Sequence, residues 1–412
     1  MNRLEKLIAE LCPDGVKYLT IPELFITRNG YTPSKANAEF WENGTIPWFR
    51  MEDIRENGRI LTKSTQYVSE KAIKGKLFPE DSIIIATSAT IGEHALIKVP
   101  SLANQRFTYL VLKDEFKSSV DMMFIFYYCF KLDEFCKTHL NQGNFASVDM
   151  KQFAEFKFPV PPLPVQREIV RILDNFTELT TELTTELTTE LTARRKQYEY
   201  YKSYLLNFNT NTPKYRLIDI FDTRNGYTPS KSNKEFWSLN DIPWFRMEDI
   251  RENGRILNKA IQGVSKSAVK GKPFPANSII VSTSATIGEH ALIRCESLAN
   301  QRFTYLMLRD EYKDKYSIMF LFYYCFVLDE YCKDNLNQGN FASVDMSRFN
   351  NFEFPMPPLE EQERIVAILD RFDKLCNDIS SGLPAEIEAR KKQYEYYRDK
   401  LLTFKEIGKH VI

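Results

Sequence analysis

The sequence is poor in the residues that build metal centres and disulfide frameworks. Its 412 residues include only four histidines, which are scattered at positions 94, 139, 290 and 410. The seven cysteines form no CxxC pair, and Cys129 and Cys136 stand seven positions apart in an apolar run, as do Cys325 and Cys332. Seven residues of helix span about 10 Å, which is too far for a disulfide. We therefore expect no metal site, and cysteines that are buried thiols in a reducing compartment.

Long apolar segments are also absent. No run approaches the roughly 18 residues that a membrane-spanning helix needs. The first residues, MNRLEKLIAELCPDG, carry acids and lack the apolar region of a signal peptide. The 55 basic residues equal the 55 acidic ones, so any charged binding surface has to be local. These absences predict a cytoplasmic protein that does not span a membrane.

What the sequence does contain is a copy of itself. Residues 27–61 match residues 223–257 at 29 of 35 positions, with an offset of 196. The same offset carries NQGNFASVDM at 141–150 onto 337–346 without insertion or deletion. Self-similarity of this kind means that one structural unit is built twice. Two similar units in one chain commonly pack about an approximate two-fold axis.

Each copy has a large and a small part. The large part combines short β-type runs, such as DSIIIATSA and NSIIVSTSA, with an apolar helical stretch. This mixture predicts the α+β class, with two similar α/β globular domains. Proline-rich hinges at 158–166 and 354–362 then lead into long helices, the second of which Gly382 and Pro384 break. Two such helices most simply pair as an antiparallel coiled coil.

The expected domain boundaries follow from these changes in pattern. They place a first globular domain at 1–157, a first helix at 158–208, a second globular domain at 209–353 and a second helix at 354–412. The first helix contains four tandem TELT tetrapeptides. Half of their residues are threonine, a mediocre helix former. We therefore expect packing to hold this segment through its leucines, Leu179, Leu183, Leu187 and Leu191.

This order of parts resembles the specificity subunits of type I restriction–modification systems (HsdS). The resemblance rests on two domains that begin with GYTPS…W…IPWFRMEDI, on a P-PPL--Q--I--IL helix start at 159–173 and 355–369, on the helix ends ARRKQYEYY and ARKKQYEYY, and on the central tetrapeptides. It covers nearly the whole chain. It implies that the globular parts are target-recognition domains for a bipartite double-stranded DNA target. It also implies two modification subunits and restriction or translocase subunits as partners, in a bacterium or archaeon.

Local charge agrees with a DNA partner. Residues 27–76 carry nine Lys and Arg against six acids and residues 223–272 carry ten against five, whereas residues 165–192 carry six acids and two arginines. Phosphate contacts need Lys and Arg, and base edges need Arg, Asn, Gln and small hydroxyls. The predicted DNA-binding residues are Arg28, Asn29, Tyr31, Ser34, Lys35, Arg50, Arg55, Arg59, Thr87, Ser88, Thr90, Gln105, Arg106, Asn141, Gln142 and Asn144, and their counterparts Arg224, Asn225, Tyr227, Ser230, Lys231, Arg246, Arg251, Arg255, Thr283, Ser284, Thr286, Gln301, Arg302, Asn337, Gln338 and Asn340.

Some residues of these segments have a plainer interpretation. RMEDIRENGR at 50–59 fits a solvated, salt-bridged segment as well as a DNA contact. Trp48 and Phe49 fit a core better than base stacking. Gly30 is a turn former first, although a loop that enters a groove also needs a turn. His94 suits a structural role and a DNA contact equally.

The sequence contains no recognisable catalytic motif. There is no GxxxxGK loop and no Asn-Pro-Pro-aromatic tetrad with a glycine-rich loop. Asp81 with residues 115–117 mimics a metal-dependent nuclease pattern, but Asn277 replaces Asp81 in the second copy. We predict a non-catalytic subunit without a cofactor of its own; the resemblance implies that partners bind S-adenosylmethionine, ATP and Mg²⁺. The alternatives are a stand-alone DNA-binding or regulatory protein without enzymatic partners, and a nuclease that acts alone.

Two expectations follow from the repeats. Two similar domains should read similar half-sites on opposite strands, which makes the target a split palindrome. The half-sites diverge only if bases are touched by residues that differ, which are Ala36/Ser232, Ala38/Lys234, 42–45 against 238–241, and 62–72 against 258–268. Separately, a TELT copy adds about 6 Å and 40° of helix, close to the rise and turn of one base pair, about 3.4 Å and 35°. A fifth copy should lengthen the unread spacer by one base pair, or two.

Overall fold

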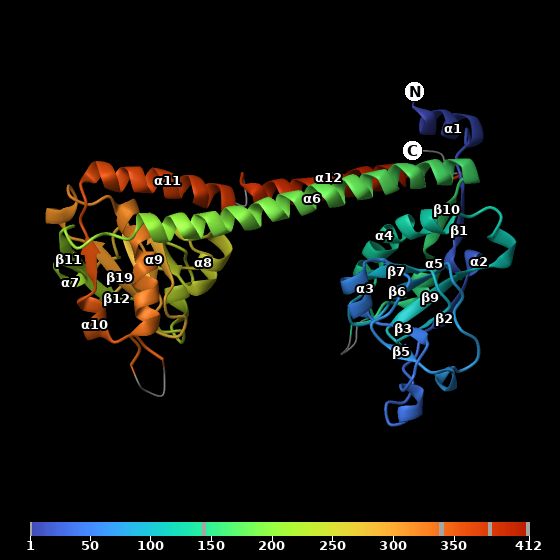
Figure 1. The fold of residues 1–412 in the computed structure, drawn as a ribbon, viewed down its shortest axis with the longest axis horizontal. Coiled ribbons are helices and arrows are strands. Elements are labelled where there is room, and N and C mark those ends of the chain that lie inside the picture. Colours follow the sequence, from blue (N-terminus) through green and yellow to red (C-terminus); the bar gives the residue numbers. More distant parts are fainter. Residues whose placement is uncertain (1, 142–145, 338–341, 378–380, 409–412) are drawn as a thin grey trace. The chain divides into compact units, whose positions relative to one another are not determined.

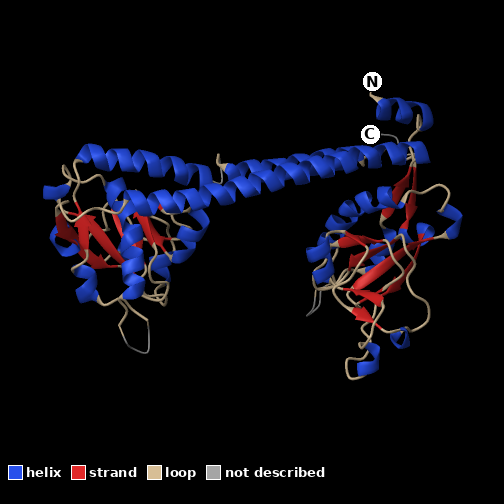
Figure 2. Ribbon diagram, viewed as in Figure 1, coloured by secondary structure: helices blue, strands red, loops and turns tan. Residues whose placement is uncertain are grey.

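The computed structural model describes residues 2–141, 146–337, 342–377 and 381–408. The chain divides into two compact units, Met1–Glu186 with Ile387–Ile412, and Leu187–Glu386. Each unit joins a mixed α/β domain to a pair of helices (Figure 1 and Figure 2). The elements of the two domains follow the same order, so the predicted α+β class with two similar domains is confirmed.

The first domain is built on a five-stranded sheet with the strand order β2-β9-β6-β7-β4 and a three-stranded sheet with the order β5-β3-β8. The strands are β2 (Phe25–Asn29), β9 (Phe107–Leu112), β6 (Ser82–Ala86), β7 (His94–Ile97), β4 (Ile60–Leu61), β5 (Tyr67–Val68), β3 (Ile46–Phe49) and β8 (Leu102–Ala103), and β1 (Lys17–Thr20) pairs with β10 (Lys157–Val160). The helices are α1 (Arg3–Leu11), α2 (Ile21–Leu24), α3 (Met51–Asn57), α4 (Met122–Thr138), α5 (Met150–Glu155) and the 3-10 turns η1 (Ala38–Phe40), η2 (Glu70–Ala72) and η3 (Asp114–Phe116).

The second domain repeats this arrangement, with the strand orders β12-β19-β16-β17-β14 and β15-β13-β18. Its strands are β12 (Phe221–Asn225), β19 (Phe303–Leu308), β16 (Ser278–Ser282), β17 (His290–Ile293), β14 (Ile256–Leu257), β15 (Gly263–Val264), β13 (Ile242–Phe245) and β18 (Leu298–Ala299), and β11 (Lys214–Arg216) pairs with β20 (Glu353–Pro355). The helices are α7 (Leu217–Ile220), α8 (Met247–Asn253), α9 (Ile318–Asp334), α10 (Met346–Asn350), η4 (Lys234–Trp237), η5 (Lys266–Ala268) and η6 (Asp310–Tyr312).

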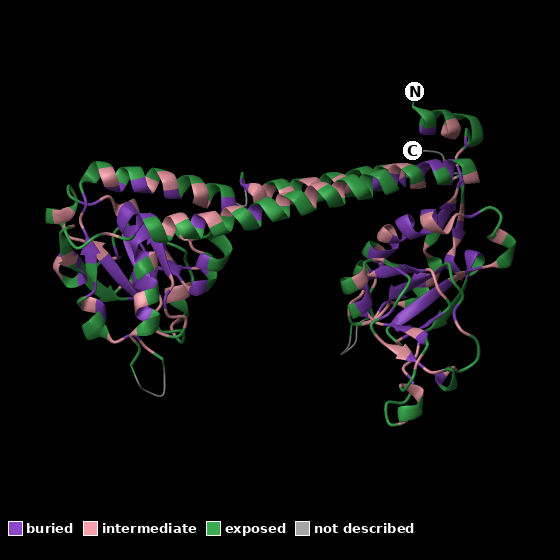
Figure 3. Ribbon diagram, in the orientation of Figure 1, coloured by how far each residue is buried: buried purple, intermediate pink, exposed green. Residues whose placement is uncertain are grey.

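Alternation along β6 places its side chains in two separate cores. Successive strand residues point to opposite faces of a sheet. Ile83 packs in the core that holds Phe124 of α4, whereas Ile84 packs in the core that holds Trp48 and Phe49 of β3. Both faces of the strand are therefore buried (Figure 3). Trp48 and Phe49 are core residues, as their plainer interpretation predicted.

The helix that carries the tetrapeptides, α6 (Leu163–Leu205), is continuous over 43 residues. Pro164 lies in its first turn. Threonine hydroxyls in the repeat donate to the carbonyl four residues earlier, as Thr181 and Thr185 do at 2.7 Å, which satisfies them within the helix. The second predicted helix is divided into α11 (Leu359–Asn377) and α12 (Leu383–Leu401), with Pro384 in the first turn of α12, so the predicted break is confirmed.

Each unit contains an antiparallel helix pair. In the first unit the ring of Phe176 stacks on Tyr397, and the hydroxyl of Thr177 lies 2.9 Å from that of Tyr394. As the residue number increases along α6, the number of its contact residue in α12 decreases, so the two helices run antiparallel. In the second unit, Phe372 of α11 stacks on Tyr201 near the end of α6. The predicted antiparallel pairing of the helices holds in each unit.

The expectation that all four repeat leucines pack is wrong for one of them. Leu191 is 9% exposed and Leu183 and Leu187 are half-buried, but Leu179 is 60% exposed. The reason is geometric. A spacing of four residues turns about 40° per step on a helix of 3.6 residues per turn, so one stripe cannot keep facing the same partner helix.

A buried glutamine joins each domain to its long helix. Gln166 is fully buried. Its side-chain amide donates to the carbonyls of Ser119 and Pro161 at 2.9 and 2.7 Å, and its oxygen accepts from the backbone N–H of Asp121 at 2.8 Å. Gln362 makes the equivalent three hydrogen bonds in the second unit. Because these partners bridge the proline hinge and the start of α4, the glutamine holds the helix start against the domain.

Candidate nucleic-acid interface

Polar residues gather where three neighbouring strands of the first sheet meet one edge. β2 ends there at Asn29, β6 ends just before Thr87, and β9 begins just after Arg106. The hydroxyl of Thr108 donates to the Asn29 side chain at 2.9 Å and lies 3.1 Å from the Thr87 hydroxyl. In the second domain, Thr304 makes the same contacts with Asn225 and Thr283 at 2.9 and 3.0 Å. Antiparallel pairing thus brings three predicted residues of each domain together.

The loop that follows β2 is held against this edge by close backbone contacts. The Tyr31 N–H donates to the carbonyl of Ala103 at 2.8 Å, and the Trp48 indole donates to the carbonyl of Tyr31 at 3.0 Å. A Cβ on Gly30 would clash with the carbonyl oxygens of Ala103 and Asn104, so glycine is required here. The Thr32 hydroxyl in this loop donates to the Gln105 side chain, and Ser34, Lys35, Gln105 and Arg106 are all exposed.

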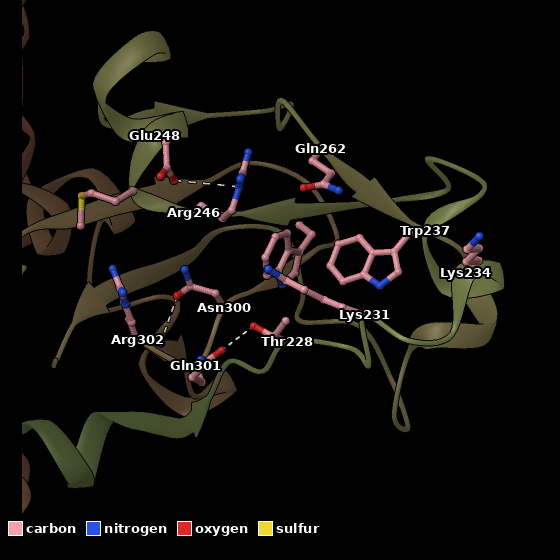
Figure 4. A pocket seen from close by; sticks show the side chains of 12 residues that line it. Thr228, Lys231, Lys234, Trp237, Arg246, Glu248, Gln262, Asn300, Gln301 and Arg302 are labelled. Carbon is pink, nitrogen blue, oxygen red and sulfur yellow. Dashed lines mark hydrogen bonds and ion pairs between the residues drawn. The ribbon is translucent and has the colours of Figure 1, made fainter. Parts of the chain in front are cut away.

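In the second domain these elements enclose a pocket of about 780 Å³ (Figure 4). One wall is aromatic, because the rings of Trp237 and Trp244 meet edge to face with centroids 5.0 Å apart. Apart from Met247 the rest is polar, and four of its five charged residues are cationic. The lining residues are Thr228, Lys231, Lys234, Trp237, Trp244, Arg246, Met247, Glu248, Gln262, Asn300, Gln301 and Arg302.

Two arginines of this pocket have donors without a hydrogen-bond partner. The buried Nε of Arg246 makes no hydrogen bond but forms an ion pair with the Glu248 carboxylate at 4.0 Å, and the Nε of Arg50 in the first domain lies 3.9 Å from the Glu52 carboxylate in the same way. The Arg302 guanidinium has no hydrogen-bond or ion-pair partner among the described residues, whereas its backbone N–H donates to the Asn300 side chain at 3.0 Å and its carbonyl accepts from the Thr283 N–H at 2.9 Å. A guanidinium with free donors can bind a guanine edge or a phosphate. The pocket therefore has the chemistry of a nucleic-acid contact.

The first domain has a smaller pocket at the equivalent place. Its volume is about 350 Å³, and its lining residues are Lys35, Ala38, Trp41, Glu42 and Gln66. Sequence reasoning missed Trp41 and Trp237, and it named Lys234 only among the positions that differ between the two copies. The available signal was an aromatic residue within a polar stretch, EFWENG or EFWSLN, where a core position is not expected.

Several predicted residues have structural partners instead. Arg59 donates to the carbonyl of His94 at 3.0 Å, lies 3.5 Å from Asp133 and covers the ring of Phe130. Arg255 makes the equivalent contacts in the second domain. These two arginines therefore anchor α4 and α9 to their sheets and do not join the polar strand edge.

Other predicted residues are tied more loosely. The guanidinium of Arg28 lies over the Phe78 ring at 3.9 Å and donates to the carbonyl of Lys76 at 2.6 Å, yet the side chain is exposed. Asn141 holds its own loop, donating to the carbonyl of Val148 at 3.1 Å. Arg55 and Arg251 are exposed on α3 and α8. Four of the predicted residues, Gln142, Asn144, Gln338 and Asn340, lie outside the described residues.

His94 has a structural role. Its ring is fully buried, its Nδ1 lies 2.7 Å from the Asp133 carboxylate, and it packs edge to face against Phe126 and Phe130. Burial lowers the pKa of His94 below its usual value, which outweighs the attraction of Asp133, whose charge Arg59 offsets. His94 is therefore neutral at pH 7.

No cluster of metal ligands occurs among the described residues. Asp81, part of the nuclease-like pattern, is bound to Lys98 at 2.6 Å, and Lys117 of the same pattern is bound to Asp114 at 2.7 Å. The cysteines are free thiols, and all except the half-buried Cys295 are buried. In the described part of the chain, no helix is long and apolar enough to cross a membrane.

Comparison with known proteins decides the family. The model of the type I restriction modification DNA specificity domain matches twice, at residues 13–193 and 210–389. The chain belongs to the specificity subunits of type I restriction–modification systems. One relative, the EcoprrI specificity subunit of Escherichia coli, is 40% identical over 397 residues, covering 92% of each chain. The EcoR124I/EcoR124II specificity subunit of Escherichia coli is 35% identical over 288 residues, covering 64% of this chain and 68% of the relative.

Solved structures agree on the fold of this type I specificity subunit. A chain from a study of assembly and conformational transition of the type I system has a TM-score of 0.66 at 18% identity and covers 95% of this chain and 98% of its own length. The HsdS subunit of Thermoanaerobacter tengcongensis has a TM-score of 0.55 at 16% identity, covering 95% and 96%. The type I specificity subunit is a non-catalytic, sequence-specific DNA-binding component of its restriction–modification complex.

Proposed function

We propose that each domain reads one half of a bipartite duplex target and that the two half-sites are identical, in opposite orientations. The proposal rests on one observation. Five polar residues that line the second pocket, which we call its floor, are identical at the corresponding positions of the first domain. Sequence readout depends on which donors and acceptors face the base edges. The paired floor residues are Thr32/Thr228, Arg50/Arg246, Asn104/Asn300, Gln105/Gln301 and Arg106/Arg302.

Methylation mapping of DNA from cells that carry this subunit with its modification partner tests the proposal. The expected motif is a split palindrome with an unread spacer. Two unrelated half-sequences in the methylated motif would overturn it.

Within each floor, residues differ in the role we assign to them. Arg106 and Arg302 with their neighbouring Gln and Asn are assigned to base edges, because these side chains form bidentate pairs with guanine and adenine. Lys35 and Lys231 are assigned to phosphates, because their charged side chains are exposed. The other predicted residues of the strand edge, such as Asn29 and Thr87, support this surface from below.

We assign the tetrapeptide segment of α6 the role of a ruler. Its continuity as a helix supports this role, because each copy then contributes a constant length of about 6 Å. The spacer between the half-sites follows the number of copies, while the floor residues that read bases are untouched.

The partners we assign are two modification subunits, together with restriction or translocase subunits, working in the cytoplasm of a bacterium or archaeon. One apolar patch occurs on the helices of each unit. In the first it consists of Phe176, Leu179, Tyr396 and Tyr397, and in the second of Phe372, Leu375, Tyr200 and Tyr201. Tyr396 is 63% exposed and Tyr200 is 64% exposed. Exposed apolar clusters mark protein contacts, and two equivalent clusters suit two copies of one partner.

S-adenosylmethionine, ATP and Mg²⁺ are assigned to these partners. Co-purification of the full-length chain with its modification subunit, followed by mass measurement of the complex, tests the partner assignment. Two modification subunits per chain are expected. A chain that binds its DNA motif alone and retains no modification subunit would instead support a stand-alone DNA-binding protein.

A further inference from the structure

The two domains differ in charge at the rim of the pocket. We define the rim as positions 35, 38, 39, 42, 45, 70 and 71 in the first domain and the positions 196 residues later in the second. The turns η1 and η2 bring these positions together, because Ser69 donates to the carbonyls of Phe40 and Glu39 at 3.0 and 2.6 Å. Ser265 links η5 to η4 in the same way. All of the rim residues are exposed in both domains.

The first rim is acidic. It contains Lys35 and Lys71 against Glu39, Glu42 and Glu70, a net charge of −1. Glu39 also lies 2.9 Å from the Lys71 ammonium, so one of the two lysines is already engaged. Glu42 lines the pocket itself.

The second rim is basic. It contains Lys231, Lys234 and Lys266 against Glu235 and Asp241, a net charge of +1. Lys234 stands in place of Ala38 and projects beside the pocket, while Ser238 replaces Glu42 (Figure 4). The Asp241 carboxylate accepts the backbone N–H of Lys266 at 3.1 Å, which partly satisfies it.

Both copies therefore share the floor and differ at the rim. From this combination we infer that the two domains read the same bases but hold the DNA backbone unequally, with the second domain making the stronger phosphate contacts through Lys234 and Lys266. This inference rests on the proposed function, in which the pockets face DNA. The physical reason is that phosphate attraction depends on local charge and carries no base information, whereas base identity is read by the shared floor.

An exchange of the two rims tests the inference in the full-length chain. One variant gives the second domain the first rim, with Lys234→Ala, Ser238→Glu, Asp241→Thr, Lys266→Glu and Ser267→Lys. The other gives the first domain the second rim, with Ala38→Lys, Glu42→Ser, Thr45→Asp, Glu70→Lys and Lys71→Ser. Lys313→Ala is the matched control, because this exposed lysine follows η6 at the opposite end of the sheet.

Binding to a short mixed-sequence duplex is measured as a function of salt. Each lost phosphate contact lowers the slope of log K against log salt by about 0.9, which changes the dissociation constant about 3.5-fold between roughly 50 and 200 mM salt. We expect the first variant to bind more weakly with a shallower slope, the second to bind more tightly with a steeper slope, and the control to match the wild type. The methylated motif should stay the same in all variants.

The outcomes separate the inference from the function on which it rests. If the wild type binds duplex DNA and methylates a motif with two like half-sites but the rim exchange leaves the salt slope unchanged, the unequal-holding inference is wrong. A change of base preference in one half-site would also overturn it, because the rim would then read bases. If the wild type shows no binding to duplex DNA, the proposed function fails. As a control for folding, each rim variant should unfold at the same temperature as the wild type, because the substituted side chains are exposed.

Discussion

Phe176 stacks on Tyr397, a residue 221 positions further along the chain, with ring centroids 6.1 Å apart and an angle of 18° between the planes. The residues of the second unit that correspond to this pair are Phe372 and Tyr201, which stack at 5.4 Å and 25°. In each unit, the helix segment that follows the proline-rich hinge of one repeat therefore packs against a helix from the other repeat. Arg398 over Phe130 and Lys202 over Phe326, both at 4.2 Å, repeat the same exchange. Each compact unit therefore needs helix residues from both repeats.

This exchange predicts that two adjacent tyrosines have separate effects. Tyr397→Ala removes the stacked ring and should destabilise the first unit by about 1 to 2 kcal/mol, because the ring is only partly buried. Tyr396→Ala, at an exposed position, should leave the unfolding temperature unchanged and weaken binding of the modification subunit. Thermal unfolding and a binding assay on both variants check this. Equal effects of the two substitutions on stability would contradict the separation.

A fifth TELT copy should lengthen the unread spacer of the methylated motif by one or two base pairs and leave both half-sites intact. The helical rise of about 6 Å per copy is the reason. Methylation mapping of cells that carry the extended chain measures the spacer. A chain in which the same four residues are inserted into an exposed stretch outside α6 serves as the control. An unchanged spacer would contradict the ruler role and would mean that the repeat is only a helical segment.

Loss of a floor arginine should weaken DNA binding without affecting the fold. We expect Arg302→Ala to reduce specific binding by about 1 to 3 kcal/mol and to relax one base position, with Arg106→Ala relaxing the same position in the other half-site. Arg255→Ala is the contrasting variant, because this arginine holds the His290 carbonyl and Asp329. It should lower the unfolding temperature. Competition binding with single-base changes and thermal unfolding distinguish the two. If Arg302→Ala unfolds the protein instead, its assignment to the floor is wrong.

Acidification should destabilise the first unit through His94. Burial lowers the pKa of His94 in the folded state, so the unfolded chain takes up its proton first as the pH falls below about 6.5. The stability contributed by neutral His94 is present above that pH and is lost below it, at up to about 1.4 kcal/mol per pH unit. Urea unfolding between pH 7.5 and 5 measures this slope, taking about 6.5 as the pH at which the loss begins. His94→Gln should flatten it. His139→Asn, which introduces the residue found at Asn335, should not.

Much of the fold was predictable from local patterns. The proline-rich hinge followed by glutamine and spaced isoleucines predicted the start of α6, and Pro164 does lie in its first turn. Gly382 and Pro384 predicted the division between α11 and α12. The candidate site was only partly predictable. Asn29, Thr87 and Arg106 meet at one sheet edge, but Arg59 turns inward to Asp133, and Trp237 lines the pocket without having been foreseen.

The sequence by itself determined that one unit is built twice, where the two long helices begin, and where the second of them breaks. These features depend on the dihedral preferences and side-chain periodicity of neighbouring residues, which a local stretch carries in full. Only the tertiary structure decided that Phe176 meets Tyr397, that Leu179 is left exposed, and that Arg59 serves the core while Arg106 faces solvent. Those outcomes depend on contacts between residues far apart in the chain and on the direction of long, flexible side chains, neither of which a local pattern specifies.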